Sequence, residues 1–224
     1  MNNPEDRAVD VVVFDLDGTV IRGDSYVAFL LGFLKRHPAR VCRTVFLPFF
    51  LSLYWCGLRD NSWLKIRFLS ALMGGAARSQ IELWAEIFAQ QLVSCAVKGK
   101  ARETIEKHRQ EGARLVLATA SLDVYVEPLS RILGFDHTVC TKVAWTNDGR
   151  LDGRLMGGNC YGNSKLASVN ALMVDQNLPA ITIAYSDHYD DLPLLKAAKC
   201  GVIVSPTKRL AKCAGDLGLR CEVW

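Results

Sequence analysis

An apolar run near the start of the chain ends in two aspartates, and it constrains the fold more than any other stretch. Three of the four residues from Val11 to Phe14 are β-branched, which is typical of a buried strand in a parallel sheet. Asp15 and Asp17 follow at its carboxyl end, where ligands bind in open α/β sheets. Because residues two apart in an extended chain point the same way, both carboxylates can converge on one small object. Their repulsion favours a divalent hard cation such as Mg²⁺ between them, whereas an isolated Asp-x-Asp would be read as a solvated acidic turn.

The second half of the chain alternates strand-like and helix-like segments, which predicts an α/β fold with a doubly wound parallel sheet. Asn147-Asp148-Gly149 joins two strand-like runs and indicates a hairpin. Asp123 is placed to cap the helix that follows it. The predicted helices span 101–111, 123–133 and 163–173, the predicted strands span 114–118, 138–145, 151–155, 180–185 and 202–205, and a last helix follows.

Residues 21–94 lack this alternation and are predicted to form a helical cap inserted into the core. Asp24 can cap a helix whose apolar residues, from Tyr26 to Leu34, share one face. Further helices are expected at 63–72 and 79–93. We therefore expect two parts, a core of residues 1–20 and 95–224 and a cap of residues 21–94. The connections near 19–24 and 95–100 would act as hinges.

The most apolar stretch of the chain lies inside this predicted cap. Val41–Leu58 has 18 residues, with Arg43 near its start and Pro48 inside, and so falls short of the roughly 20 apolar residues of a transmembrane helix. Its large side chains are too many for a cap of this size to bury, so we expect an exposed patch. A membrane contact is one interpretation of this patch, supported by basic residues just upstream. Core of the cap and dimer contact are the alternatives. The upstream basic residues are Lys35, Arg36, Arg40 and Arg43.

Composition restricts the class of protein further. The 224 residues are 50% hydrophobic and 22% charged, which describes a globular chain with one sizeable core. A net charge of +4 is too mild to indicate nucleic-acid binding. The start of the chain is polar and acidic, unlike a secretory signal peptide, and the eight cysteines form no Cys-x-x-Cys pair. Reduced thiols in a cytoplasmic protein are therefore expected, and the oligomeric state stays open.

Polar side chains follow three of the predicted strands and meet at one edge of the sheet if those strands are parallel neighbours. They are Asp15 and Asp17 after the first strand, Thr119 and Ser121 after the second, and Asp187, Asp190 and Asp191 after a third. Lys165 begins a helix after a glycine-rich loop. Taken alone, Lys165 would be a solvated helix residue and Asp187 a helix cap, so only the joint pattern indicates a site.

In order and spacing, these groups resemble the four signature motifs of the haloacid dehalogenase superfamily. The motifs are Asp15-Leu16-Asp17-Gly18-Thr19, Thr119, Lys165 and Ser186-Asp187-His188-Tyr189-Asp190-Asp191. The helical insertion is similar to the cap of the phosphoserine-phosphatase-like branch. Its apolar, basic-flanked run looks more specifically like that of phosphatidylglycerophosphatase C and its relatives. The resemblance implies a Mg²⁺-dependent phosphatase with a Rossmann-like core.

The resemblance also implies roles for the motif residues. Asp15 would attack phosphorus and form an aspartyl-phosphate, while Asp17 would protonate the leaving alkoxide and then activate water. Thr119 would bind phosphate oxygens and Lys165 would supply positive charge. The predicted catalytic residues are Asp15, Asp17, Thr119 and Lys165; the predicted substrate-binding residues are Gly18, Asp24, Ser121 and Asp190; and the predicted metal ligands are Asp15, Asp17 through its carbonyl, Asp187 and Asp191.

The substrate is less constrained than the reaction. A lipid phosphate at the inner face of a membrane, such as phosphatidylglycerophosphate, and a soluble metabolite such as phosphoserine both suit the motifs. The fourth motif departs from the Gly-Asp-Gly-x-Asn-Asp of the phosphoserine phosphatases, which weakens phosphoserine. A non-catalytic phosphate-binding protein would have no need of Asp17. Lys65 and Arg67 could meet a second anionic group of the substrate, although a solvated helix face is the simpler interpretation.

Overall fold

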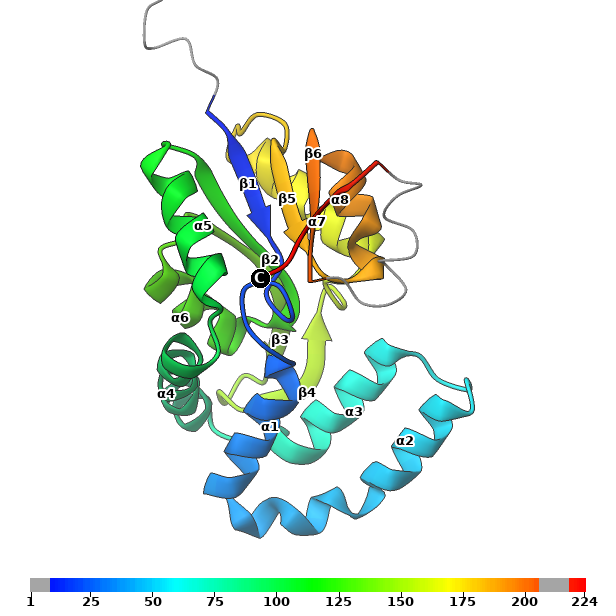
Figure 1. The fold of residues 1–224 in the computed structure, drawn as a ribbon. Helices are drawn as coiled ribbons and strands as arrows, with labels where there is room; N and C mark the ends of the chain where they lie inside the picture. The colour runs from blue at the N-terminus through cyan, green and yellow to red at the C-terminus, as the bar shows by residue number, and fades with distance from the viewer. Residues whose placement is uncertain (1–8, 206–217) are drawn as a thin grey trace, which may run out of the picture.

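A seven-stranded sheet forms the centre of the computed structural model, which describes residues 9–205 and 218–224. The order of the strands is β4-β3-β2-β1-β5-β6-β7, and all neighbours are parallel except β3 and β4 (Figure 1). The predicted α/β class is therefore confirmed. The strands are β1 (Val11–Phe14), β2 (Arg114–Leu122), β3 (His137–Trp145), β4 (Leu151–Met156), β5 (Ile183–Ser186), β6 (Cys200–Val204) and β7 (Arg220–Glu222).

The fully buried strand β1 joins the two layers of helices that cover the sheet. Its side chains alternate between the two faces, as the pleat of a strand requires. Val12 and Phe14 belong to the apolar cluster under α5 and α6, whereas Val11 and Val13 belong to the cluster under α7 and α8. Burial on both faces explains why β1 is apolar at every position. The four helices are α5 (Gly99–Gln110), α6 (Asp123–Leu133), α7 (Asn163–Asp175) and α8 (Leu192–Ala197).

Four α-helices and one 3₁₀ helix form the block that was expected as a cap, at the carboxyl end of the strands (Figure 1). Residues 21–94 are all described, and none of them forms a strand of the sheet. Phe29 of α1 contacts Trp84 of α4 and Tyr125 of the core helix α6, with ring centroids 6.0 and 4.6 Å apart. The block and the core thus share one apolar cluster, and their division into two domains stays a prediction. The helices are α1 (Ser25–Arg36), η2 (Pro38–Phe46), α2 (Leu47–Trp55), α3 (Asn61–Met73) and α4 (Arg78–Cys95).

The two segments that connect the block to the core run side by side. The Arg22 N–H donates to the Ala96 carbonyl at 2.9 Å, and the Lys98 N–H donates to the Val20 carbonyl at 3.0 Å. The Lys98 amine also donates to the Gly18 carbonyl, beside the two aspartates. The two connections therefore form one paired segment next to the site.

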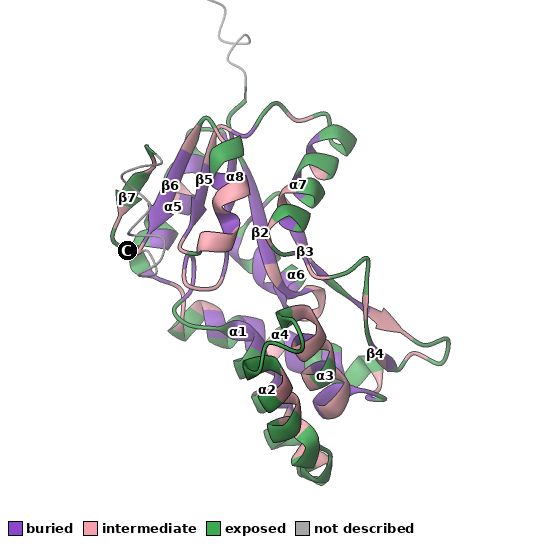
Figure 2. Cartoon of the chain, turned by 90° about the vertical axis from the view of Figure 1, so that its right-hand side faces the viewer, coloured by how far each residue is buried: buried purple, intermediate pink, exposed green. Residues whose placement is uncertain are grey.

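The apolar run does not form one continuous α-helix. It divides into η2, a 3₁₀ helix, and α2, because Pro48 lies in the first turn of α2 and has no N–H to continue the preceding helix. No residue of η2 or α2 is fully buried, so the expected exposed patch is present (Figure 2). None of the described helices is both long and apolar enough to cross a bilayer.

Several predicted boundaries differ from those observed. Asp123 begins α6 rather than capping it, since its carboxylate accepts hydrogen bonds from the Val124 and Val143 N–H groups and ties α6 to β3. β2 continues to Leu122, four residues beyond the prediction, and the strand expected at 180–185 is β5. Strand β7 was not predicted. The last predicted helix falls outside the described residues.

Candidate active site

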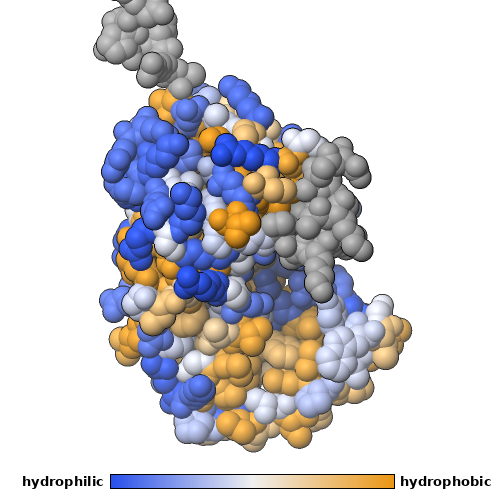
Figure 3. Space-filling model, in the orientation of Figure 1, coloured by the Kyte–Doolittle hydropathy of each residue, from blue (hydrophilic) through white to orange (hydrophobic). Residues whose placement is uncertain are grey.

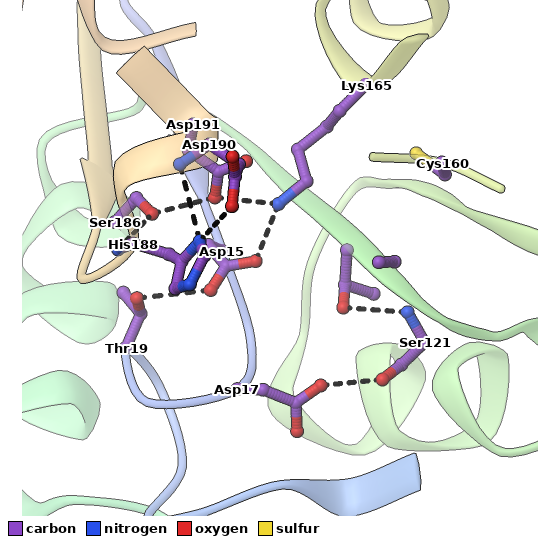
Figure 4. A network of polar contacts seen from close by, with 12 residues as sticks. Asp15, Asp17, Thr19, Ser121, Cys160, Lys165, Ser186, His188, Asp190 and Asp191 are labelled. Carbon is purple, nitrogen blue, oxygen red and sulfur yellow. Dashed lines mark hydrogen bonds and ion pairs between the residues drawn. The ribbon is translucent and has the colours of Figure 1, made fainter. Parts of the chain in front are cut away.

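A buried lysine joins two carboxylates at the carboxyl edge of the sheet. The Lys165 amine, in the first turn of α7, donates to Asp15 Oδ1 and to Asp191 Oδ2, both at 2.8 Å (Figure 4). Asp15 directly follows β1, and Asp191 closes the short 3₁₀ helix η3 (Tyr189–Asp191) after β5. The Ser186 hydroxyl donates to the same Asp191 oxygen at 2.7 Å. Three segments far apart in the chain thus position one cation against Asp15.

Burial and the neighbouring charges together set the pKa values of Asp15 and Lys165. Desolvation raises the pKa of Asp15 to about 7, because the positive charge of Lys165 offsets only part of the cost of burying the carboxylate. Desolvation alone would lower the pKa of Lys165, but Asp15 and Asp191 outweigh it and raise that pKa. Lys165 is therefore a permanent cation, and Asp15 needs further positive charge nearby to stay fully ionised at neutral pH.

Asp17 is turned away from Asp15 and is held by a separate set of donors. The Ser121 hydroxyl donates to its Oδ2 at 2.6 Å (Figure 4). The Ser25 N–H donates to its Oδ1 at 2.7 Å. Burial raises the pKa of Asp17, although both serines favour its charged form. Asp15 and Asp17 therefore do not converge on one point, contrary to the expectation from the sequence. Instead, Asp17 is fixed as a second carboxyl group that faces the same pocket, and its charge contributes to the raised pKa of Asp15.

Thr19 was not assigned a role from the sequence, yet it links the first and fourth motifs. Its hydroxyl lies 3.2 Å from Asp15 Oδ2 and 3.4 Å from Asp187 Oδ1, so it can donate to either carboxylate. In the other direction, the Asp187 N–H donates to the Thr19 hydroxyl at 2.9 Å. Burial raises the pKa of Asp187. The Thr19 hydroxyl thus brings Asp15 and Asp187 together. The short spacing of four residues between Asp15 and Thr19 is the one sequence signal for this contact.

Gly18 leaves the space that Asp187 occupies. Its φ is +79°, and a Cβ built on it would lie 2.1 Å from Asp187 Oδ2. We expect Gly18→Ala to destabilise the fold by roughly 1–3 kcal/mol and to displace Asp187, because the left-handed backbone and the clash both oppose the methyl group. Urea unfolding with parallel activity assays measures both effects. Gly149→Ala, also at positive φ but with open space around it, is the matched control for backbone strain alone.

A cavity of about 380 Å³ lies between the sheet edge and the helical block, and its lining includes Asp15, Asp17, Lys165, Asp187 and Asp191. Thr119 and Ser121 enter from the end of β2, and the Ser121 N–H donates to the Thr119 hydroxyl at 3.1 Å. The opposite wall is more apolar and comes from α1, α2 and α3. The residues of that wall are Tyr26, Val27, Leu51, Asn61, Leu64, Lys65 and Phe68.

Lys65 was expected on a solvated helix face, and that interpretation is wrong. The side chain is 9% exposed, and its amine donates to the Ala120 carbonyl at 2.6 Å and to Asn159 Oδ1 at 3.1 Å. Burial lowers the pKa of Lys65 to about 8, against the opposing charges of Asp17 and Asp24. The pocket therefore holds a second amine, which comes from α3 and lies beside the Thr119–Ser121 segment. Arg67, by contrast, is exposed.

The remaining predicted residues lie around the mouth of the pocket. Asp24 caps α1 by accepting from the Val27 N–H at 3.1 Å, and it also lines the pocket. The structure is therefore compatible with both predicted roles of Asp24, the helix cap and the substrate-binding residue. Asp190 is absent from the pocket wall and accepts a hydrogen bond from the Tyr161 hydroxyl. The His188 ring lies 2.9 Å from Asp190, is about half exposed and also lines the pocket.

The charges of the pocket suit a divalent cation. Five aspartates line it, against two lysines and His188: Asp15, Asp17, Asp24, Asp187 and Asp191. Carboxylate oxygens are the ligands that hard cations such as Mg²⁺ prefer. Among the described residues, no three Asp, Glu, His or Cys side chains form a ready-made metal site. The donors available to a hard cation are therefore carboxylates such as Asp15 and Asp187 together with main-chain or water oxygens.

Comparison with known proteins identifies the family. The pattern of the haloacid dehalogenase-like hydrolases matches residues 12–196, which include every residue of the site described above. The chain belongs to this family. It is 29% identical over 197 residues to protein CicA of Caulobacter vibrioides, covering 84% of this chain and 82% of CicA.

One of the relatives of this chain is named as a phosphatase. Phosphoserine phosphatase SerB1 of Mycobacterium tuberculosis is 28% identical over 211 residues, which cover 92% of this chain and 68% of SerB1. A crystal structure of a Bordetella pertussis Tohama I protein of unknown function has the same fold, with a TM-score of 0.80, 23% identity and coverage of 96% and 98%. The family and its phosphatase relatives together support a phosphatase.

Proposed function

We propose that this enzyme is a Mg²⁺-dependent phosphomonoester hydrolase that works through an aspartyl-phosphate at Asp15. The observation that carries the proposal is the separation of two carboxyl groups, the buried Asp15 and the half-buried Asp17, into different environments. Asp15 faces the cation Lys165 at 2.8 Å, whereas Asp17 is held apart by Ser121 and Ser25. Paired groups with different environments suit a nucleophile and a proton carrier.

The reaction would proceed in two steps. A carboxylate oxygen of Asp15 attacks phosphorus, the ester P–O bond breaks, and Asp17 gives its proton to the departing alkoxide. In the second step Asp17 takes a proton from water, the water oxygen attacks phosphorus, and phosphate leaves with Asp15 restored. The raised pKa of Asp17 suits the first role, because a carboxyl group that holds its proton can donate it. Thr119 and Lys165 would bind the phosphate oxygens.

The cation would be held by Asp15, Asp187 and the main-chain carbonyl of Asp17, with water completing the ligands. Asp191 would act through Lys165, to which it is already bonded. When bound, Mg²⁺ would supply the positive charge that an anion attacking a phosphate dianion requires. The excess of carboxylates in the pocket supports this assignment.

We further propose a membrane lipid phosphate, such as phosphatidylglycerophosphate, as the substrate. Apolar side chains of α1, α2 and α3 form one wall of the pocket, and α2 also has exposed apolar side chains on its outer side. A substrate with both a phosphate and apolar chains would use both features. The resemblance of the apolar, basic-flanked run to that of phosphatidylglycerophosphatase C agrees with this substrate class.

A soluble metabolite phosphate is the alternative, and the pair Lys65 and Asp24 favours it. Both side chains line the pocket, and they would suit a substrate with an acid group and an amine, such as phosphoserine. The relative SerB1 is named for that activity. Both proposed substrates have an anionic group besides the phosphate monoester, so Lys65 can serve either.

The charge of Lys65 gives a testable pH dependence. Since the pKa of Lys65 is lowered to about 8, the amine is charged below that pH and neutral above it. We expect KM for a substrate with a second anionic group to rise as the pH passes 8, and we expect Lys65→Met to raise KM about tenfold at pH 7 and remove this rise. Arg67→Met, two residues along the same helix but exposed, should leave the KM profile of a soluble substrate such as phosphoserine unchanged.

A substrate screen tests the proposed function. Purified enzyme is assayed for phosphate release from phosphatidylglycerophosphate in mixed micelles, from phosphoserine and from p-nitrophenyl phosphate, with Mg²⁺ and with EDTA. Release that requires Mg²⁺ and favours the lipid supports the proposal, and preference for phosphoserine selects the alternative. Absence of Mg²⁺-dependent release from all three, in a folded enzyme, would overturn both.

A further inference from the structure

The outer side of η2 and α2 exposes large apolar side chains. We define the η2–α2 surface by five residues whose exposed fractions run from 58% to 78%: Val45, Phe46, Phe49, Trp55 and Leu58. Figure 3 shows hydrophobic side chains gathered over the lower part of the molecule, where Figure 1 places α1, α2 and α3. Clusters of this size on a globular protein mark contacts with a membrane or a partner.

Positive charge is concentrated around the same surface. Residues 35–67 contain seven Lys or Arg and one acid, Asp60, which gives a net charge of +6. The whole chain has a net charge of +4, so the rest of it is at −2. The excess of positive charge therefore lies in residues 35–67. It favours an anionic partner for this face.

A groove of about 390 Å³ lies between η2, α2 and α3 and has two guanidinium groups in its wall. The Arg67 guanidinium lies over the rings of Trp63 and Phe50, at 5.3 and 6.0 Å, and Arg43 donates to the Gly74 carbonyl at 2.7 Å. Among the residues that the structure describes, no carboxylate lines this groove. Two arginines on a partly apolar wall suit the phosphate of a headgroup, with its chains against the rings.

The inner side of α2 borders the active-site pocket. Leu51 lines that pocket, together with Leu64 and Phe68 of α3, whereas Phe49 and Trp55 are exposed. One helix therefore separates the η2–α2 surface from the cavity that contains Asp15. A molecule in contact with this surface would lie within a helix diameter of the cavity.

We propose that the η2–α2 surface docks the enzyme onto a bilayer that contains anionic lipids. A second copy of the chain fits less well, because a symmetric dimer through this face would bring the basic residues of the two copies together. Aromatic and aliphatic side chains flanked by basic ones are typical of contact with the interface of a bilayer. Docking would bring a lipid phosphate to the active site, so this inference rests on the proposed function. Vesicle binding itself needs no catalysis and can be measured separately.

Flotation with vesicles tests this inference. We expect full-length enzyme to bind vesicles of phosphatidylcholine with about 30% phosphatidylglycerol at least tenfold more tightly than pure phosphatidylcholine, and less tightly at high salt. The double variant Phe49→Ser/Trp55→Ser should lose binding about tenfold or more, and so should Arg43→Gln/Arg67→Gln. The matched control is Leu83→Ser/Val174→Ser, whose side chains are 67% and 83% exposed on α4 and α7, and it should bind like the wild type.

Two further measurements separate the outcomes. Asp15→Asn should bind vesicles as the wild type does, because docking needs no catalysis. Wild-type enzyme that binds vesicles but releases phosphate from no phosphomonoester would count against the proposed function alone. The Phe49→Ser/Trp55→Ser variant should keep its activity on soluble p-nitrophenyl phosphate while losing turnover of a lipid phosphate in vesicles. Binding that is missing at low salt, or equal in all variants, would overturn the inference. So would a dimer by light scattering that the same variant dissociates.

Discussion

Asp15→Asn should lower turnover of every phosphomonoester by at least about 10⁴-fold, because an amide is a poor nucleophile and a weaker ligand for a cation. The fold should survive, since Lys165 keeps its ion pair with Asp191 and the amide removes a carboxylate whose burial is costly. Steady-state kinetics with and without Mg²⁺ measure the loss. Circular dichroism and thermal unfolding check the fold.

A trapping experiment tests the covalent step behind this prediction. Acid quenching during turnover of a ³²P-labelled substrate should leave label on the wild-type protein and none on Asp15→Asn. Beryllofluoride, which mimics an acyl phosphate, should bind the wild type when Mg²⁺ is present. Asp175→Asn at the exposed end of α7 is the matched control and should behave as the wild type. Wild-type turnover by Asp15→Asn, with contamination excluded, would disprove the mechanism.

Asp17→Asn should lower turnover by roughly 10²–10⁴-fold, the usual contribution of general acid–base catalysis. The asparagine can still accept from the Ser25 N–H and bond to the Ser121 hydroxyl, so the position of the side chain should be kept. The loss should depend on the leaving group. p-Nitrophenolate departs without a proton, whereas an alkoxide needs one, so formation of the aspartyl-phosphate should be spared for p-nitrophenyl phosphate.

The second step then identifies the role of Asp17. Since activation of water also needs a base, Asp17→Asn should accumulate labelled enzyme with p-nitrophenyl phosphate, in contrast to the unlabelled Asp15→Asn. Asp60→Asn, which keeps the cap of α3, is the matched control. Equal losses for alkyl and nitrophenyl substrates, with no accumulated label, would show that Asp17 is a structural residue.

The position of Lys65 on the inner face of α3 is predictable from the sequence. Lys65 precedes Leu69 and Leu72 by four and seven positions, and both leucines are buried, so the helical period alone puts Lys65 on the inner face of α3. A lysine was read as solvated because charged side chains are seldom buried. Its acceptors, the Ala120 carbonyl and Asn159, lie on segments far along the chain that no local pattern connects to α3.

The local pattern of the sequence determined the α/β class, the strand before Asp15 and the order of the four motifs, because strand and helix periods and the ends of buried strands are properties of neighbouring residues. The tertiary structure decided which groups meet. It turned Asp17 toward Ser121, joined Asp15 to Asp187 through Thr19, and brought Lys65 into the pocket. Contacts between residues up to 168 positions apart depend on how layers pack, and packing is set by the whole chain rather than by any one stretch of it.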